Sequence, residues 1–108
     1  MIKPSQVVFI SEELEKNFDK LSETNQIKKS IKRAIEDLKQ NAFWGIRIPK
    51  KLFPEEYVSK YNITNLWKYD LPDGWRLIYT VTSENKVELI SAILEWFNHK
   101  DYERRFHY

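Results

Sequence analysis

The side chains of this chain that could do chemistry are concentrated in two stretches. In residues 75–82, Arg76 stands among β-branched and aromatic neighbours. In residues 94–108, His99 and Tyr102 are mixed with acidic, basic and aromatic side chains. An imidazole and a phenol can exchange protons, and a guanidinium can bind an anion. Whether they form a site depends on the elements that position them.

Composition excludes several other kinds of site. The chain has no cysteine, which excludes a disulfide framework and a thiolate metal site. Glu95 and Asp101 are not a convincing carboxylate pair, because no further ligand or metal-ligand spacing accompanies them. We therefore expect no metal and no cofactor.

Length and composition indicate one globular domain over residues 1–108. The 108 residues suffice for a single core. Charged residues make up 31% and aromatic residues 15%, which excludes a disordered chain. No apolar run approaches the roughly 20 residues of a spanning helix, and the start, MIKPSQVVFISEE, lacks the apolar stretch of a signal peptide. We expect a cytoplasmic protein. The net charge of +2 permits a nucleic-acid partner without demanding one.

Residues 65–93 read as three consecutive antiparallel strands. The middle one, Trp75–Thr82, alternates two largely apolar faces and is expected to be central. The turn signal Pro72-Asp73-Gly74 folds Asn65–Leu71 back on it. The polar turn Ser83–Asn85 joins it to a strand at Lys86–Ile93.

The N-terminal part predicts a strand and a helical hairpin. The strand is Gln6–Ile10. A helix over Glu12–Leu21 follows, capped by Ser11, and a second runs from a cap at Thr24 or Asn25 to about Asn41. With a C-terminal tail or short helix, this predicts an α+β fold in which strand and hairpin pack on an antiparallel sheet of about four strands.

The connection 42–63 is the least regular segment of the chain. One long element is excluded by Gly45, Pro49 and Pro54. A short helix from Pro54 to about Tyr61 is expected, ended by Asn62 in a left-handed conformation. Lys50 and Lys51 are expected on an exposed loop.

This order of elements resembles the RelE/ParE superfamily of toxins from type II toxin–antitoxin modules. The resemblance covers nearly the whole chain and rests on the phrases NLWKYDLPDGWRLIYTV and SAILEWFNHKDYERRF. Its core is Gly74-Trp75-Arg76-Leu77-Ile78-Tyr79, followed by His99 and Tyr102 after the last strand. It implies a RelE-like fold and a small endoribonuclease that cuts mRNA, in many members on the ribosome, and that a cognate antitoxin neutralises.

The implied chemistry needs no metal. The 2′-hydroxyl attacks the adjacent phosphorus, which requires a base, cations around the phosphorane and an acid for the leaving 5′-oxygen. By resemblance, Arg76 stabilises the transition-state charge, and His99 and Tyr102 are the candidates for general acid or base. The expected RNA phosphate contacts are Lys68, Lys50, Lys51, Arg104 and Arg105. The candidates for base stacking are Trp67, Tyr69 and Trp75.

Each assignment has a plainer structural alternative. Arg76 could pair with Glu88 across the hairpin, and Tyr102 could be an aromatic residue of the core. The three aromatic stacking candidates could serve the core or face an antitoxin. The second helix carries a basic cluster that is expected to be a solvated face: Lys28, Lys29, Lys32 and Arg33.

The resemblance is also compatible with a function without catalysis. Asp70 stands where active members often carry a cation, and the total charge is modest. The ParE branch inhibits DNA gyrase and lacks the catalytic set. The alternative function is therefore a binding protein of the same fold, either a gyrase inhibitor or an inactive antitoxin-binding relative.

Overall fold

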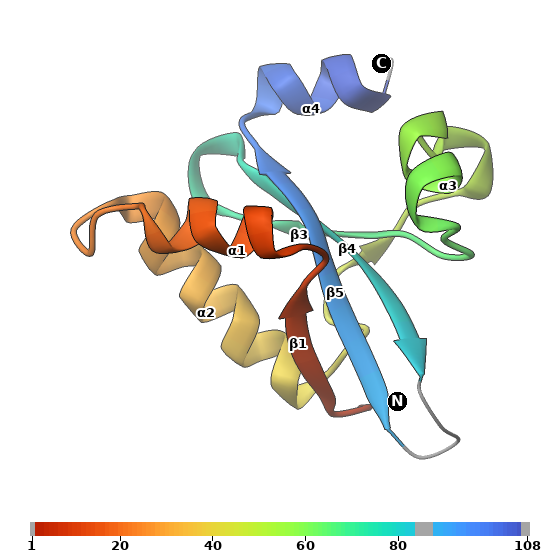
Figure 1. Ribbon diagram of the computed structural model, residues 1–108, viewed down its shortest axis with the longest axis horizontal. Helices are drawn as coiled ribbons and strands as arrows, with labels where there is room; N and C mark the ends of the chain where they lie inside the picture. Colours follow the sequence, from red (N-terminus) through yellow and green to blue (C-terminus); the bar gives the residue numbers. More distant parts are fainter. Residues whose placement is uncertain (1, 84–87, 107–108) are drawn as a thin grey trace.

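A five-stranded mixed sheet organises the computed structural model, which describes residues 2–83 and 88–106 (Figure 1). The strand order is β1-β5-β4-β3-β2. The strands are β1 (Ser5–Phe9), β2 (Ile46–Arg47), β3 (Trp67–Asp70), β4 (Arg76–Ser83) and β5 (Leu89–Phe97). The α+β class is thereby confirmed, with β4 in the middle as expected.

The prediction of an antiparallel sheet of about four strands is wrong in two respects. β1 pairs with β5 in parallel, from Ser5 opposite Leu89 to Phe9 opposite Ile93. A long connection separates these two strands, so no hairpin forces them to be antiparallel. The additional strand β2 pairs with β3 at the opposite edge, and its two residues are too few to show an alternating pattern.

Strand β4 is buried on both faces, from Leu77 to Val81. Leu77, Tyr79 and Val81 belong to the core under one pair of helices, and Ile78 belongs to a second core on the other face. The sheet therefore has a core on each of its faces.

The helical hairpin on the first face consists of α1 (Glu12–Asp19) and α2 (Gln26–Gln40), at the left of the sheet in Figure 1. Ser11 caps α1, since its hydroxyl accepts the Leu14 N–H at 3.1 Å. Asn25 caps α2 through the N–H groups of Ile27 and Lys28. Ile31, Ala34 and Leu38 are fully buried against the sheet.

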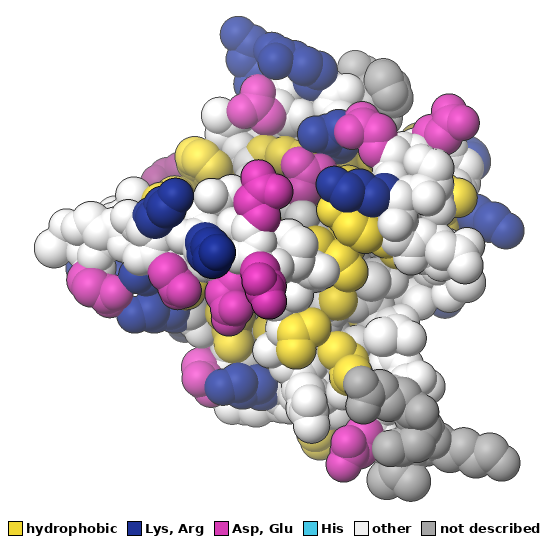
Figure 2. All heavy atoms as spheres, in the orientation of Figure 1, with side chains coloured by type: hydrophobic (Ala, Val, Ile, Leu, Met, Phe, Trp, Pro, Cys, Tyr) yellow, Lys and Arg dark blue, Asp and Glu magenta, His cyan; other side chains and the backbone are white. Residues whose placement is uncertain are grey.

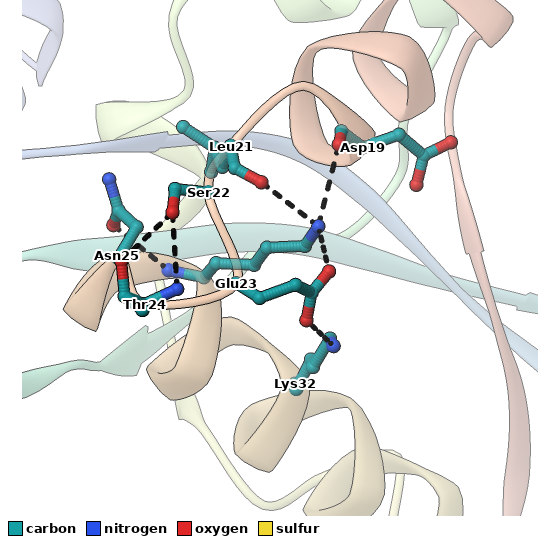
Figure 3. A network of polar contacts seen from close by, with 8 residues as sticks. Asp19, Leu21, Ser22, Glu23, Thr24, Asn25 and Lys32 are labelled. Atoms are coloured by element: carbon teal, nitrogen blue, oxygen red, sulfur yellow. Dashed lines mark hydrogen bonds and ion pairs between the residues drawn. The ribbon is translucent and has the colours of Figure 1, made fainter.

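A buried lysine, Lys28, stabilises the link between α1 and α2. Lys28 is only 5% exposed, and its ammonium donates to the carbonyls of Asp19 (3.4 Å) and Leu21 (3.0 Å) and to the Glu23 carboxylate (2.7 Å). Glu23 also accepts from Lys32 at 2.8 Å, as Figure 3 shows. The expectation of a solvated basic face is therefore wrong for Lys28, because its ammonium satisfies carbonyls near the end of α1.

The second face is covered by α3 (Glu55–Tyr61) and α4 (His99–Phe106). α3 lies on the right of Figure 1, and α4 follows the upper end of β5. Asn62 has the expected left-handed conformation (φ 51°) and ends α3. Short 3-10 turns occupy Lys50–Leu52 and Pro72–Gly74.

The last strand ends later than the predicted Lys86–Ile93, and within the described residues it begins at Leu89; Lys86 and Val87 of the prediction lie outside them. Residues 84–87, including Glu84 and Asn85 of the predicted turn, lie outside the described part of the chain. At its other end, β5 continues to Phe97 through a register shift opposite Ile78 and Tyr79, with Leu94 as the extra residue. The strand continues because it borders buried β4, and α4 starts at His99, two residues after the last residue of β5. Among the described residues, no helix has the length and apolar character needed to cross a membrane.

Candidate functional site

Three of the predicted site residues meet above the second face of the sheet. The Lys68 ammonium, from β3, lies 5.5 Å from the centre of the Tyr102 ring. The Arg76 guanidinium, from the start of β4, lies 5.5 Å from the centre of the same ring. Tyr102, on α4, is only 2% exposed, and its ring lies 4.7 Å from that of Phe106. We refer to Lys68, Arg76, His99 and Tyr102 as the Arg76 patch.

The β3–β4 hairpin explains why the two cations share a face. Asp70 lies opposite Arg76 and Lys68 lies opposite Ile78, so alternate residues of the two strands point the same way. The turn between them holds Asp73 (φ 58°) and Gly74 (φ 79°) in the left-handed region, which glycine adopts without penalty. The turn signal in the sequence therefore sets the register that brings the cations together.

Arg76 is held by a carboxylate on the neighbouring strand. Its Nε lies 3.1 Å from Asp70 Oδ1, a contact between opposite charges that lacks the direction of a hydrogen bond. Its Nη1 donates to the Trp75 carbonyl at 3.2 Å. The suggested pairing with Glu88 is wrong, because the register puts Arg76 opposite Phe97, at the far end of the hairpin from Glu88.

His99 is the exposed member of the Arg76 patch. It opens α4, its side chain is 60% exposed, and its Nε2 lies 2.7 Å from Glu103 one turn later. Its Cβ packs against the turn before β4, so that a Cβ added at Gly74 would stand 3.2 Å away. His99 thus borders the turn that leads into Arg76.

The predicted phosphate contacts at the end of the chain are engaged with carboxylates. Arg104 lies 3.8 Å from Asp101 on the same helix. Arg105 binds Glu56 of α3 and, at 3.3 Å, Glu95 of β5. Burial opposes the charge of Arg105, but these carboxylates outweigh it and raise its pKa.

The same network includes a buried phenol. The Tyr57 hydroxyl donates to Glu95, and burial together with this hydrogen bond raises the pKa of Tyr57 well above its usual range. Arg105 and Tyr57 therefore act together in attaching the two helices of this face to β5.

The remaining predicted residues lie elsewhere. Lys50 and Lys51 are exposed on the 3-10 turn after β2, and Lys50 lines a hollow of about 290 Å³ that does not include Arg76. Trp67, Tyr69 and Trp75 pack against the core of the first face, which leaves them outside the Arg76 patch.

Most basic side chains in and around the patch have an acidic neighbour. Arg76, His99, Arg104 and Arg105 each face at least one carboxylate, whereas Lys68 has no ion pair with any described residue. Figure 2 shows basic and acidic side chains interspersed over α1, α3 and α4. Residues 2–83 and 88–106 contain no group of three or more His, Asp or Glu side chains placed to hold a metal ion.

Sequence reasoning missed the acidic partners of these side chains. The spacing of His99 and Glu103, four residues apart on a helix, is a signal that could have revealed one of them. The pairing of Arg105 with Glu56 joins residues far apart in the chain, and no local pattern reports it.

No protein-family model, curated protein or solved structure matches this chain. The functional assignment therefore depends on the residues and geometry described above.

Proposed function

We propose that this chain is a RelE/ParE-like toxin that cuts mRNA without a metal, with the Arg76 patch as its site. The observation that supports this most directly is the shared contact of Lys68 and Arg76 with the Tyr102 ring. Three residues from β3, β4 and α4 lie together, with His99 at the border.

Each residue then has a physical role. Attack of the 2′-oxygen on phosphorus forms a 2′,3′-cyclic phosphate and breaks the bond to the 5′-oxygen. Arg76 and Lys68 stabilise the negative charge that develops on the phosphorane. His99, which is exposed, accepts the proton of the attacking 2′-hydroxyl and then donates it to the leaving 5′-oxygen. Tyr102 is buried and positions the two cations through its ring face.

Asp70 would have to release Arg76 during catalysis. Its carboxylate is more than half exposed, so an incoming phosphate can compete with it for the guanidinium. Asp70→Asn should therefore increase cleavage rather than reduce it.

The test is induced expression in a bacterial host, with growth and mapped mRNA 5′-ends as readouts. Arg76→Ala and His99→Ala should each reduce cleavage about a hundredfold, as loss of a transition-state contact does. Lys39→Ala, which removes an exposed cation on α2, is the control and should leave cleavage unchanged. An Arg76→Ala protein that folds and cuts mRNA like the parent would contradict the assignment.

A second candidate function is a binding protein of the same fold that does not cut RNA. It is favoured by the carboxylates that face Arg76, His99, Arg104 and Arg105. Purified protein that inhibits DNA supercoiling by gyrase, while mRNA in expressing cells stays intact, would support this function instead.

A further inference from the structure

A second surface of the molecule combines free cations with an exposed tryptophan. It is a groove of about 730 Å³ between α2 and the end of β3. The residues of the groove used below are Lys29, Arg33, Asp37, Trp44, Tyr69 and Asp70. We refer to it as the α2 groove.

The cations of the α2 groove differ from the others on the same helix. Lys28, Lys32 and Lys39 each form an ion pair. Lys29 and Arg33 are exposed and have no ion pair with any described residue. They are four residues apart, so their Cβ atoms are about 5–6 Å apart on one face of the helix.

The acidic residues of the groove already have partners. Asp37 accepts a hydrogen bond from the Tyr69 hydroxyl at 2.5 Å. Burial and this hydrogen bond raise the pKa of Tyr69 to about 12, so the phenol keeps its proton at neutral pH. Asp70 faces Arg76. Two cations are thus available to an anionic ligand.

Trp44 is exposed although the backbone beside it is firmly held. Trp44 is 52% exposed. The Tyr79 hydroxyl accepts the Gly45 N–H and donates to the Ala42 carbonyl, both at 2.9 Å. The Trp44 N–H donates to the Asn41 carbonyl at 3.2 Å. A large ring carried by such a fixed loop can stack on a base without a further cost of ordering the backbone.

We propose that the α2 groove binds the single-stranded RNA that flanks the cut site. Trp44 stacks on a base, and Lys29 and Arg33 contact successive phosphates. Asp70, at the end of β3, lines this groove and also faces Arg76, so an RNA strand leaving the groove can pass around the end of β3 to the Arg76 patch on the other face of the sheet. This inference extends the proposed function and rests on it.

Binding of a fluorescently labelled RNA tests the proposal. A short single-stranded RNA with 2′-O-methyl riboses has no attacking hydroxyl, so binding is measured without cleavage. Trp44→Ala should weaken binding about tenfold, as expected for the loss of one stacked base, and Trp44→Tyr should restore most of it. Equilibrium unfolding of each variant verifies the fold.

Salt dependence tests the cations separately. Replacing Lys29 and Arg33 by glutamine should reduce the slope of log K against log salt by about 1.4, because two phosphate contacts are lost. The double variant Lys16→Gln/Lys20→Gln removes two exposed cations from the α1 side, outside the groove, and should leave the slope unchanged.

The outcomes separate this inference from the proposed function. If groove variants bind RNA like the parent while Arg76→Ala abolishes cleavage, the groove assignment is wrong and the nuclease stands. If the parent neither binds this RNA nor cuts mRNA, both are wrong. If Trp44→Ala abolishes binding to an acidic protein partner but not to RNA, the groove is a protein interface and the inference is overturned.

Discussion

At the scale of single residues, Lys28 shows that a charge in a basic cluster can be structural. Its ammonium has three acceptors and lies 5.4 Å from the centre of the Phe18 ring, whereas Lys32 on the same helix is largely exposed. A buried cation without partners would be costly, so the acceptors are what make this position possible. The two lysines share one carboxylate and form a natural pair for comparison.

Lys28→Met should destabilise the fold by about 1–3 kcal/mol, because it leaves two backbone carbonyls at the end of α1 without their donor. Lys32→Met removes only an exposed ion pair and should change stability by at most about 1 kcal/mol. Urea unfolding followed by circular dichroism measures both values. Equal effects of the two substitutions would mean that Lys28 contributes only its charge.

Glu23 predicts how stability responds to acid. The hydrogen bonds from Lys28, then from Lys32, lower its pKa from 4.5 to about 2. In the folded state the Glu23 carboxyl group holds a proton less tightly than in the unfolded state. The stabilisation from its contacts with the two lysines is therefore present above pH 4.5 and is lost as the pH falls toward 2. Glu23→Gln should therefore destabilise the protein at pH 6 and much less at pH 2.5. Unfolding curves at both pH values provide the test. The prediction would be contradicted if variant and parent differed in free energy of unfolding by the same amount at pH 6 and at pH 2.5.

At the scale of elements, the short edge strand β2 depends on Gly45. A Cβ at this position would stand 2.4 Å from the Lys68 carbonyl oxygen and 2.8 Å from the Tyr79 hydroxyl. β2 and β3 can approach each other only because glycine has no side chain. The same close approach lets Tyr79 hold both ends of the loop that carries Trp44.

Gly45→Ala should destabilise the fold by about 1–3 kcal/mol, since β2 must move away from β3 or the backbone must strain. It should also expose the loop amides to solvent. Hydrogen exchange at the amides of residues 45 and 48 reports the loosening directly, and Asn62→Gly, at the left-handed residue that ends α3, is the control. Unchanged exchange at both amides would show that the edge can accommodate the methyl group.

Elements with local signals could be predicted from sequence, and those set by distant contacts could not. Ser11, Asn25 and Asn62 mark helix ends through bonds or dihedral angles within a few residues. The parallel pairing of β1 with β5 joins residues more than eighty positions apart and leaves no local pattern. The local turn signal likewise predicted the β3–β4 hairpin that carries Lys68 and Arg76, whereas the burial of Tyr102 follows from α4 packing on the sheet.

At the scale of the whole molecule, Arg105 joins three elements that the chain order keeps apart. It connects α4 to Glu56 on α3 and to Glu95 on β5, and Tyr57 completes the network. α4 also carries Tyr102 and His99 of the Arg76 patch. Anything that loosens α4 should therefore disturb the proposed site from a distance.

Arg105→Leu should destabilise the protein by about 1–2 kcal/mol and speed hydrogen exchange in α4. The cause is that Glu95 loses its counter-charge while it remains half-buried beside Tyr57. Arg104→Leu is the matched control, because its long, exposed contact with Asp101 on the same helix contributes little. If α4 is held mainly by the packing of Tyr102 and Phe106, the α4 amides will exchange at the same rate in both variants. The contacts of Arg105 would then be a consequence of packing and not its cause. If Arg105 is the attachment, only its replacement will loosen the helix, and mRNA cleavage by that variant should fall with it.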